Sequence, residues 1–352
     1  MKQLTAIAIS GGIDSLVAAY LLKKAGHNII GIHFLTGYEK ITTASNHSST
    51  HPVSNVADQL GIPFEVVDIS QDFKKTVVDY FTRTYQDGKT PNPCLVCNPA
   101  IKFGTVLNHA RSMGATCLAT GHYAQIKKDD QGAFHLFRGK DPEKEQSYFL
   151  AFLSQDQLSS ACFPLGGLTK AETKELAKEN GLIPVEKNES QDVCFIRKTS
   201  YHEFLTLDKN FETKTGQIED INGKFLGRHD GLHRFTIGQR RGINCPASEP
   251  YYVVRIDMQR NRLIVGFKKD LFSQKCKVVR INWIGNAPDS RVHLNTRVRY
   301  RSQPVASVVN PTGKDSAIVT FKTPQPAITP GQGAVFYKDD EVLGGGFIEM
   351  DD

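Results

Sequence analysis

The sequence has a glycine-rich stretch near its N-terminus that could bind phosphate. It reads ISGGIDS over residues 9–15 and lies between the apolar run 4–9 and the helix-like run 16–22. Paired glycines let a backbone approach a phosphate closely, and unpaired N–H groups at a helix start attract anions. Asp14 and Ser15 are residue types that cap helices. The stretch predicts a phosphate-binding loop or an ordinary strand-to-helix turn, and the residues alone favour neither.

Three cysteines occupy places where a thiol could do chemistry. Cys94 and Cys97 have two residues between them, a spacing that suits a redox pair, two metal ligands or one reactive thiolate beside a helper. Pro91 and Pro93 argue against a regular helix or central strand around them. Cys194 lies where the chain changes from polar to apolar. We expect the remaining four to be small buried side chains: Cys117, Cys162, Cys245 and Cys276.

Two further stretches hold candidate binding residues. Gly121 and His122 follow the apolar run 116–120, where a glycine would let a nucleotide approach. The histidine would either contact a ligand or be a satisfied polar residue. The stretch 228–242 carries six Arg or His residues with glycines and one aromatic. It either follows a phosphate backbone or forms a solvated basic loop, and charge alone does not decide between them.

Strands and helices alternate over the first half of the chain. Apolar runs predict four strands, at 4–9, 28–35, 63–69 and 116–120. Helical patterns separate them, at 16–22, 51–60, 71–85 and 101–113. This alternation predicts a doubly wound parallel α/β sheet, whose ligands bind at the carboxyl ends of the strands. The polar loop 36–50 follows the second strand and could close over a substrate.

Two local signals extend this domain. A polar turn between the β-like runs 123–128 and 133–138 predicts a hairpin. Thr169 with Glu172 three residues later predicts a capping box at the start of a helix over 168–181.

The second half of the chain has a different pattern of apolar residues. Past about Thr206, helical periodicity disappears and short β-like runs recur between turn residues. They predict strands at 251–257, 262–267, 277–283, 298–302, 317–321 and 334–337. We therefore expect three domains: a nucleotide-binding catalytic domain over 1–205, a small central domain over 206–270 and a C-terminal β-barrel over 271–352.

Composition places the chain among globular proteins. Its 352 residues are 39% hydrophobic and 23% charged, and the net charge of +6 permits a polyanionic partner without requiring one. No apolar run reaches the length of a membrane span and the N-terminus has no signal-peptide pattern, so we expect a cytoplasmic location. Seven cysteines in that setting argue for thiol chemistry or metal binding over a disulfide framework.

Several motifs in order give the chain a family resemblance. ISGGIDS resembles the SGGxDS signature of the PP-loop ATP pyrophosphatases, which cleave ATP between its α- and β-phosphates. Nearly the whole chain resembles the bacterial MnmA family of tRNA-specific 2-thiouridylases, through TPNP, CN, IKFG, ATGHYA, KEQSYFL, ESQDVCFI, GLHRFTIGQRRGI, TPGQGAVFY and LGGGFIE. The resemblance implies a PP-loop domain, a small central domain and a C-terminal β-barrel. It also implies transfer of sulfur to C2 of the wobble uridine.

The resemblance implies roles for particular residues. Cys97 corresponds to the catalytic cysteine and Cys194 to the cysteine that carries a persulfide from a donor protein, leaving a disulfide to be reduced. The ATP phosphates, shielded by Mg²⁺, would be held by Ala8, Ile9, Ser10, Gly11, Gly12, Ile13, Asp14 and Ser15. Phe34 and Gly121 would line the nucleotide pocket. The target base would meet Asn92, Pro93 and Cys94. Further tRNA contacts would be His122, Lys144, Glu145, Gln146, Arg299, Tyr300 and Gln332.

Two departures from the family pattern leave alternatives open. The family usually has Asp in place of Cys94, and the loop 36–50 is shorter and less acidic than expected. Cys94, Cys97 and Cys194 form a three-cysteine set, and other PP-loop thiolases hold a [4Fe-4S] cluster with three cysteines. The alternatives are therefore a persulfide relay or such a cluster. Another PP-loop enzyme acting on a small molecule, or a non-catalytic tRNA-binding module, competes with both. We expect a monomer.

Overall fold

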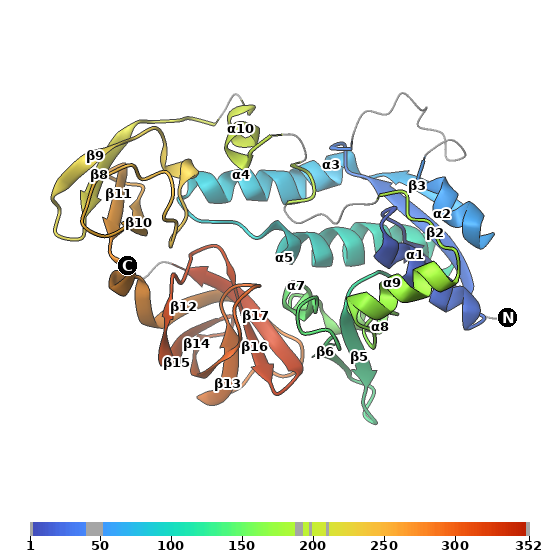
Figure 1. Cartoon of the computed structure of the whole chain (residues 1–352). Coiled ribbons are helices and arrows are strands. Elements are labelled where there is room, and N and C mark those ends of the chain that lie inside the picture. The colour runs from blue at the N-terminus through green and yellow to red at the C-terminus, as the bar shows by residue number, and fades with distance from the viewer. Residues whose placement is uncertain (1–2, 40–51, 187–192, 197–198, 209–210, 350–352) are drawn as a thin grey trace.

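The N-terminal domain is built on a five-stranded parallel sheet (Figure 1). The computed structural model describes residues 3–39, 52–186, 193–196, 199–208 and 211–349. The strand order is β3-β2-β1-β4-β7. The bounds are β1 (Leu4–Ala8), β2 (Asn28–Leu35), β3 (Phe64–Asp68), β4 (Ala115–Ala119) and β7 (Ala161–Cys162). The predicted doubly wound sheet is confirmed, and its topological switch point lies between β1 and β4, where such sheets bind ligands.

Helices cover both faces of this sheet. The helices are α1 (Ile13–Lys24), α2 (Ser54–Leu60), α3 (Ser70–Phe73), α4 (Asp79–Gln86), α5 (Pro93–Cys97), α6 (Leu107–Ser112), α7 (Ser147–Leu150), α8 (Gln155–Ser159), α9 (Lys170–Glu179) and α10 (Tyr201–Thr206). Successive side chains of a strand point to opposite faces of the sheet, and each face has its own hydrophobic core. Ala6 packs in the core formed with the helices from α3 to α8, and Ile7 packs in the core formed with α1, α2 and α9. Burial on both faces explains the continuous apolar runs. No helix in the described part of the chain is long and apolar enough to cross a membrane.

Two helical rods contain π-helical segments. The segment η1 (Lys74–Val78) joins α3 to α4, and η2 (Asn98–Val106) joins α5 to α6. The predicted helix 71–85 is therefore one rod. The second rod starts at Pro93 instead of the predicted 101, so the expectation that prolines exclude a helix here was wrong. Proline is tolerated at the first helical position because the N–H group it lacks has no helical partner there.

Only the start of the predicted loop 36–50 lies among the described residues. There the carboxylate of Glu39 accepts hydrogen bonds from the Thr36 N–H at 2.7 Å and the Gly37 N–H at 3.0 Å. Burial opposes the charge of Glu39, but these backbone donors outweigh it and lower the pKa of the carboxyl. The expectation that the loop closes over a substrate concerns the rest of the segment, outside the described residues.

The central domain is a four-stranded sheet. Its strands, in the order β10-β11-β8-β9, are β8 (Gly216–Asp220), β9 (Phe225–His229), β10 (Tyr252–Asp257) and β11 (Arg262–Gly266). The basic stretch 228–242 divides in two: His229 and His233 are buried, whereas four arginines are exposed. The exposed arginines are Arg228, Arg234, Arg240 and Arg241. Of the six Arg and His side chains in this stretch, these four arginines are the ones that a polyanion can reach.

The C-terminal domain is a closed barrel of six strands, as predicted. The strands are β12 (Phe272–Trp283), β13 (Val292–Arg297), β14 (Val305–Gly313), β15 (Ser316–Pro326), β16 (Gly333–Lys338) and β17 (Glu341–Glu349). They run in the order β12-β15-β14-β13-β16-β17, and pairing of β12 with β17 closes the barrel. The predicted strand 298–302 was wrong. Strand β13 ends at Arg297, whose side chain forms a buried ion pair. The chain then makes a turn in which the Ser302 N–H donates to the Arg299 carbonyl at 3.0 Å.

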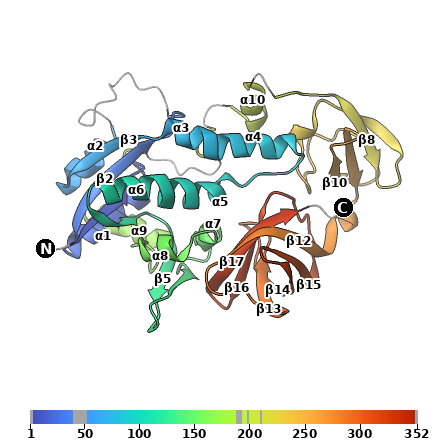
Figure 2. The ribbon, with the colours of Figure 1, turned by 180° about the vertical axis from the view of Figure 1, so that it is seen from behind.

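The catalytic domain contributes a hairpin to the barrel sheet. The predicted hairpin is confirmed as β5 (Ala124–Lys128) and β6 (Phe134–Arg138), and β6 pairs with β17 through Leu136 opposite Val342. The rear view shows the hairpin beside the barrel (Figure 2). His135 on β6 adds side-chain contacts, to Glu341 at 2.6 Å and to Asp129 at 3.0 Å. Backbone hydrogen bonding therefore joins the two domains.

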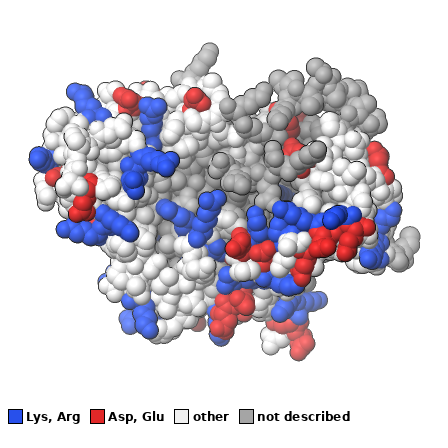
Figure 3. All heavy atoms as spheres, viewed as in Figure 1, with Lys and Arg blue, Asp and Glu red and all other residues white. Residues whose placement is uncertain are grey.

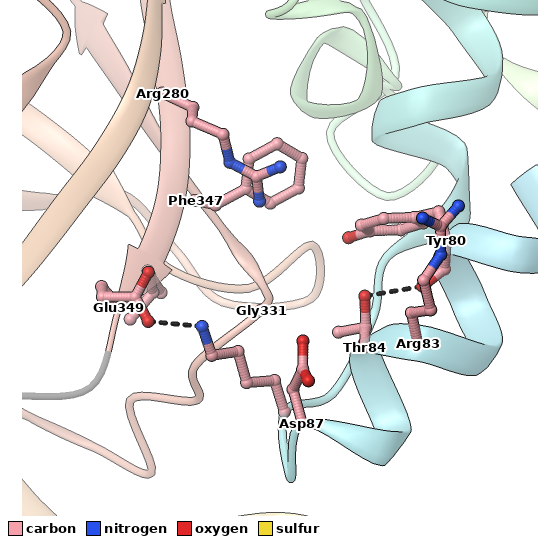
Figure 4. A pocket seen from close by; sticks show the side chains of 10 residues that line it. Tyr80, Arg83, Thr84, Asp87, Arg280, Gly331, Phe347 and Glu349 are labelled. Carbon is pink, nitrogen blue, oxygen red and sulfur yellow. Dashed lines mark hydrogen bonds and ion pairs between the residues drawn. The ribbon is translucent and has the colours of Figure 1, made fainter. Parts of the chain in front are cut away.

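A second contact between these domains encloses a small cavity beside α4. Lys89 pairs with Glu349 at 2.5 Å, and the guanidinium of Arg280 lies 4.4 Å from the centre of the Phe347 ring. The cavity has a volume of about 310 Å³ (Figure 4). None of the cysteines and no residue of the ISGGIDS loop lines it. It belongs to the seam between the domains and lies apart from the predicted site.

A buried ion pair crosses the same seam. Glu145 in the catalytic domain is 1% exposed and pairs with Arg297 of the barrel, which is 8% exposed. Arg138 on β6 lies 3.8 Å from the same carboxylate, and the Ser147 hydroxyl donates to it at 2.6 Å. Removing one member of a buried pair leaves an uncompensated charge, which costs more free energy than the intact pair contributes.

We expect Arg297→Met to destabilise the protein. The substitution leaves the Glu145 carboxylate buried with only Arg138 nearby, so the free energy of unfolding should fall by about 3 kcal/mol. Urea unfolding measures this as a lower midpoint. The control is Arg301→Met, at an exposed position in the adjoining turn, with an expected change below about 0.5 kcal/mol. Equal midpoints for the two variants would show that the pair does not stabilise the seam.

Candidate active site

The ISGGIDS loop lies between β1 and α1. Gly11 has a φ of +88°, a conformation that favours glycine, and Gly12 is the N-cap of α1. Asp14 and Ser15 are therefore not the caps predicted from their types. Ser15 instead folds back, donating to the Gly12 carbonyl at 3.0 Å and accepting from the Ser10 N–H at 3.2 Å. No side chain of the described residues caps α1, so its N-terminus is suited to an anion.

Side chains from distant elements hold Asp14. Its carboxylate accepts from Lys170 Nζ at 2.7 Å and from the Tyr123 hydroxyl at 2.7 Å. The Tyr123 hydroxyl oxygen also lies 3.0 Å from Thr173 Oγ1 on α9. Lys170 is only 9% exposed, so Asp14 neutralises a largely buried cation. The helix α9 begins with the predicted capping box of Thr169 and Glu172, which positions Lys170 beside the loop.

Gly121 packs directly against the ISGGIDS loop. A Cβ at this position would lie 2.9 Å from the Asp14 carbonyl carbon and 3.0 Å from the Ser15 nitrogen. Only glycine lets β4 and the loop meet this closely. Phe34 is half-buried near the carboxyl end of β2, opposite Val67 of β3. Phe34 and Gly121 thus lie at the carboxyl edge of the same sheet, and their contact with a nucleotide stays a prediction.

The helix α5 carries Cys94 and Cys97. Asn92 is its N-cap and Pro93 its first residue. Asn98 anchors the helix by donating from Nδ2 to the Cys94 carbonyl at 3.0 Å and to the Phe149 carbonyl at 3.0 Å. Cys94 is solvent-exposed and Cys97 is half-buried. The rigid start of the rod therefore presents two thiols one turn apart.

Aromatic packing of the neighbouring Phe195 fixes the turn that carries Cys194. It lies exposed in a turn that the Ile196 N–H closes on the Val193 carbonyl at 3.0 Å. The next residue, Phe195, is 4% exposed, and its ring lies 5.3 to 5.8 Å from those of Tyr38, Phe73, Phe81 and Phe204. The buried phenylalanine thus fixes one side of the turn while the cysteine faces outward.

The three thiols share one electrostatic environment. The pKa of the Cys97 thiol is raised to about 12, mainly by burial; Cys194 and Cys94 add to the rise, and Lys102 opposes it. The pKa of Cys94 rises to about 11 because the surrounding protein desolvates the thiol, although the side chain still touches solvent. Cys194 raises this pKa as well, and Lys102 opposes the rise. The three predicted cysteines therefore lie close enough to act on one another electrostatically, and burial disfavours the thiolate forms of Cys97 and Cys94.

The cysteines do not form a metal site. Across the described residues, which include all three, no group of three or more His, Cys, Asp or Glu side chains is placed to hold a metal ion. The alternative of a [4Fe-4S] cluster on Cys94, Cys97 and Cys194 is a different arrangement from a single-ion site, and it stays a prediction.

His122 is buried between Thr120 and Lys102. Its Nδ1 lies 2.6 Å from Thr120 Oγ1 and its Nε2 lies 3.3 Å from Lys102 Nζ. An ammonium group can only donate, so Nε2 accepts and Nδ1 carries the proton. Burial holds the pKa of His122 well below its usual range, and Lys102 lowers it further. The ring is neutral and both its nitrogens have partners, so its predicted contact with tRNA stays a prediction.

The barrel reaches the segment before α5. Gln332 donates from Nε2 to the Thr90 carbonyl at 3.0 Å and to the Pro91 carbonyl at 3.1 Å, and Asn92 lies 3.5 Å from its Oε1. The neighbouring Gly331 has a φ of +89° and lies so close that a Cβ would be 2.7 Å from the Thr90 carbonyl oxygen. Two residues predicted to meet tRNA, Asn92 and Gln332, are thus brought together.

The other predicted tRNA contacts differ in exposure. Tyr300 is half-buried 4.3 Å from the Phe149 ring, and Arg299 is exposed and donates to Thr329 at 3.1 Å. Lys144 and Gln146 are half-buried, and Gln146 accepts from the Tyr123 N–H at 3.1 Å. Glu145 is buried in its ion pair, so its side chain can affect tRNA only through its neighbours. On the face of Figure 3, Lys and Arg predominate over the central domain, and charges of both signs lie along α9.

Several site residues were not predicted from the sequence. Lys170 and Tyr123 hold Asp14, Phe195 anchors Cys194, and Lys102 faces the thiols. The motifs IKFG, ATGHYA and ESQDVCFI contain three of these four residues, so motif membership was the available signal. Their partners lie too far away in sequence for spacing to indicate the contacts.

Family models of tRNA-modifying proteins match nearly the whole chain. Residues 3–198 match the model described as tRNA methyl transferase HUP domain. Residues 204–267 match the tRNA methyl transferase PRC-barrel domain, and residues 273–348 match the aminomethyltransferase beta-barrel domain. The chain belongs to the family of the tRNA-specific 2-thiouridylases MnmA, as the resemblance implied.

Individual relatives cover almost the whole chain. The tRNA-specific 2-thiouridylase MnmA of Desulfosudis oleivorans is 50% identical over 99% of this chain and 95% of its own length. That of Geobacter metallireducens is 43% identical over 97% and 96%. Among solved structures, the U34-tRNA thiolase NcsA from Methanococcus maripaludis with its [4Fe-4S] cluster is 20% identical over 59% of this chain and 66% of its own. Its TM-score of 0.36 is too low to bear on mechanism.

We expect Gly121→Ala to weaken ATP binding at least tenfold. The added Cβ would meet backbone atoms of residues 14 and 15, so the start of α1 and the loop must move. Equilibrium binding of ATP measures the loss. The matched control is Gly167→Ala, whose Cβ would meet nothing within 4 Å and which should bind ATP within about twofold of the wild type. Wild-type affinity in Gly121→Ala would remove the loop from the nucleotide site.

Proposed function

We propose that the protein is an ATP-dependent tRNA-uridine 2-sulfurtransferase that replaces O2 of the wobble uridine with sulfur. One observation carries the proposal: Cys97 and Cys194 share an environment beside the sheet edge where Gly121 packs on the ISGGIDS loop. A reaction that needs both nucleotide activation and a sulfur nucleophile suits this arrangement. The name of the curated relatives, tRNA-specific 2-thiouridylase, supports the same substrate.

ATP activates the base before sulfur arrives. The C2 carbonyl of uracil is a poor electrophile and its oxygen a poor leaving group. Attack of that oxygen on the α-phosphate of ATP forms the adenylate and releases diphosphate, and AMP then becomes the leaving group. Residues 8–15 would hold the phosphates with Mg²⁺ shielding their charge, and Phe34 and Gly121 would line the nucleotide pocket. The wobble base must leave its stack to enter the site.

Cys194 carries the sulfur as a persulfide received from a donor protein. The Cys97 thiolate attacks Cys194 Sγ, the persulfide S–S bond breaks, and hydrosulfide leaves as the Cys97–Cys194 disulfide forms. Hydrosulfide then attacks C2, and AMP departs with the original oxygen. An external thiol reductant supplies two electrons to regenerate both cysteines. The balance requires one ATP, one sulfur and one reduction for each 2-thiouridine.

The tRNA would lie across both domains. Asn92, Pro93 and Cys94 would meet the target base beside Gln332, and Arg299, Tyr300 and Lys144 would contact the surrounding RNA. The exposed arginines of 228–242 would add a salt-dependent contact with phosphates. We propose a monomer acting in the cytoplasm, where its tRNA substrate is found.

We expect Cys97→Ser and Cys194→Ser each to eliminate 2-thiouridine, because a hydroxyl can neither carry nor attack sulfane sulfur. Mass spectrometry of digested tRNA measures the product. The matched controls are Cys162→Ser and Cys276→Ser, away from the thiol cluster, which should retain thiolation within about threefold. AMP formation from ATP with tRNA should persist in all four variants. Thiolated tRNA from either of the first two variants would contradict the role given to that cysteine.

Cys94→Ala separates the persulfide relay from a cluster. In the relay only Cys97 and Cys194 exchange sulfur, so the variant should keep part of its activity, and Cys94→Asp should keep more because it restores the usual family residue. The relay also predicts that anaerobically prepared wild type contains no stoichiometric iron. Stoichiometric iron and sulfide in the wild type, lost together with thiolation in Cys94→Ala, would establish the cluster instead.

A further inference from the structure

The reaction proposed above gives Lys102 no role, yet its charge acts on the thiols of Cys97 and Cys94. It is half-buried on η2, the π-helical continuation of α5. The Leu107 N–H bonds to the Lys102 carbonyl, five residues back, which shows the wide spacing of this segment. With that spacing, the residue five positions after Cys97 returns to the same side of the rod. The π-helical turn thus places Lys102 on the side of the rod that carries Cys97.

The ammonium is held in place from the other side. Lys102 Nζ donates to His122 Nε2 at 3.3 Å, and His122 Nδ1–H donates to Thr120 Oγ1 at 2.6 Å. The His122 ring is buried and its edge contacts the Phe163 ring, with centroids 5.7 Å apart. Because the imidazole of His122 is neutral, it accepts the hydrogen bond of Lys102 without cancelling the positive charge of the ammonium. Thr120 and His122 therefore orient the lysine from the strand end that adjoins the nucleotide loop.

We propose that Lys102 stabilises the Cys97 thiolate during sulfur transfer, with His122 as its positioning residue. The inference rests on the proposed function and assigns a further residue to it. Within the described chain, the groups acting electrostatically on Cys97 are Lys102, Cys194 and Cys94, and Lys102 is the cation among them. Burial disfavours the thiolate, and the two neighbouring thiols oppose it further.

Lys102 acts at one step of the relay. Cys97 loses its proton to solvent, and its thiolate forms a bond to Cys194 Sγ while the persulfide S–S bond breaks. The negative charge moves from Cys97 to the departing hydrosulfide, which leaves close enough to Lys102 for the ammonium to stabilise it. A fixed cation favours both the thiolate and the anionic leaving group without gaining or losing a proton itself.

Alkylation of Cys97 tests the proposal without requiring turnover. Full-length wild type, Lys102→Gln and Lys102→Arg are treated with iodoacetamide from pH 6 to 10, and the rate at Cys97 is read by peptide mass spectrometry. Lys102→Gln should react about tenfold more slowly at pH 8, because loss of the cation raises the pKa of the thiol. Lys102→Arg should react within about threefold of wild type. Lys75→Gln, an exposed lysine on the π-helical segment η1, is the matched control and should match wild type.

The outcomes separate this proposal from the proposed function. Wild-type alkylation of Cys97 in Lys102→Gln, or equal slowing in Lys102→Arg, would overturn the role of the charge. AMP formation with tRNA should persist in Lys102→Gln while 2-thiouridine falls at least tenfold. If the wild type forms neither AMP nor 2-thiouridine, the proposed function fails, and the alkylation rates still report on Lys102. If Lys102→Gln does not fold by circular dichroism, Lys102→Met replaces it with the same expectations.

Discussion

The desolvation of the Cys97 thiol is the constraint on which the rest of the site depends. In the proposed reaction, excluding water would protect the adenylate from hydrolysis, but the same exclusion disfavours the thiolate. The residues around Cys97 offset this effect on the thiolate. Ring contacts of Phe195 fix the turn that carries Cys194, and Lys102 supplies positive charge near the half-buried Cys97 thiol. Apolar packing and one cation thus act on the same sulfur atom from different elements.

The barrel belongs to the catalytic architecture because its position is fixed by the catalytic domain. Strand β6 extends the barrel sheet through β17, Glu145 pairs with Arg297 across the seam, and Gln332 holds the carbonyls that precede α5. Three kinds of interaction, backbone pairing, a buried ion pair and side-chain hydrogen bonds, converge on this seam. A tRNA bound to the barrel would therefore meet Asn92 and the thiols in a defined geometry.

Sequence reasoning identified the elements better than the contacts between them. The alternating apolar runs predicted the parallel sheet because parallel strands are buried on both faces. ISGGIDS was placed correctly between strand and helix, although Gly12 rather than Asp14 or Ser15 is the cap. The pairing of β6 with β17 had no signal, since backbone hydrogen bonds are independent of side-chain type. Pro93 was misread because its effect depends on whether it lies at the start or the interior of a helix.

The pairing of β6 with β17 also affects how the chain is made. His135 on β6 and Glu341 on β17 lie 206 residues apart, and synthesis proceeds at about 5–20 residues per second. The ribosome therefore needs about 10–40 seconds between producing the two partners. Throughout that interval the outer edge of β6 has no strand to pair with, and open edges invite pairing with other chains. Biogenesis of this protein therefore includes a period in which a nascent chain must be kept from its neighbours, and that period shortens wherever translation of the central domain is fast.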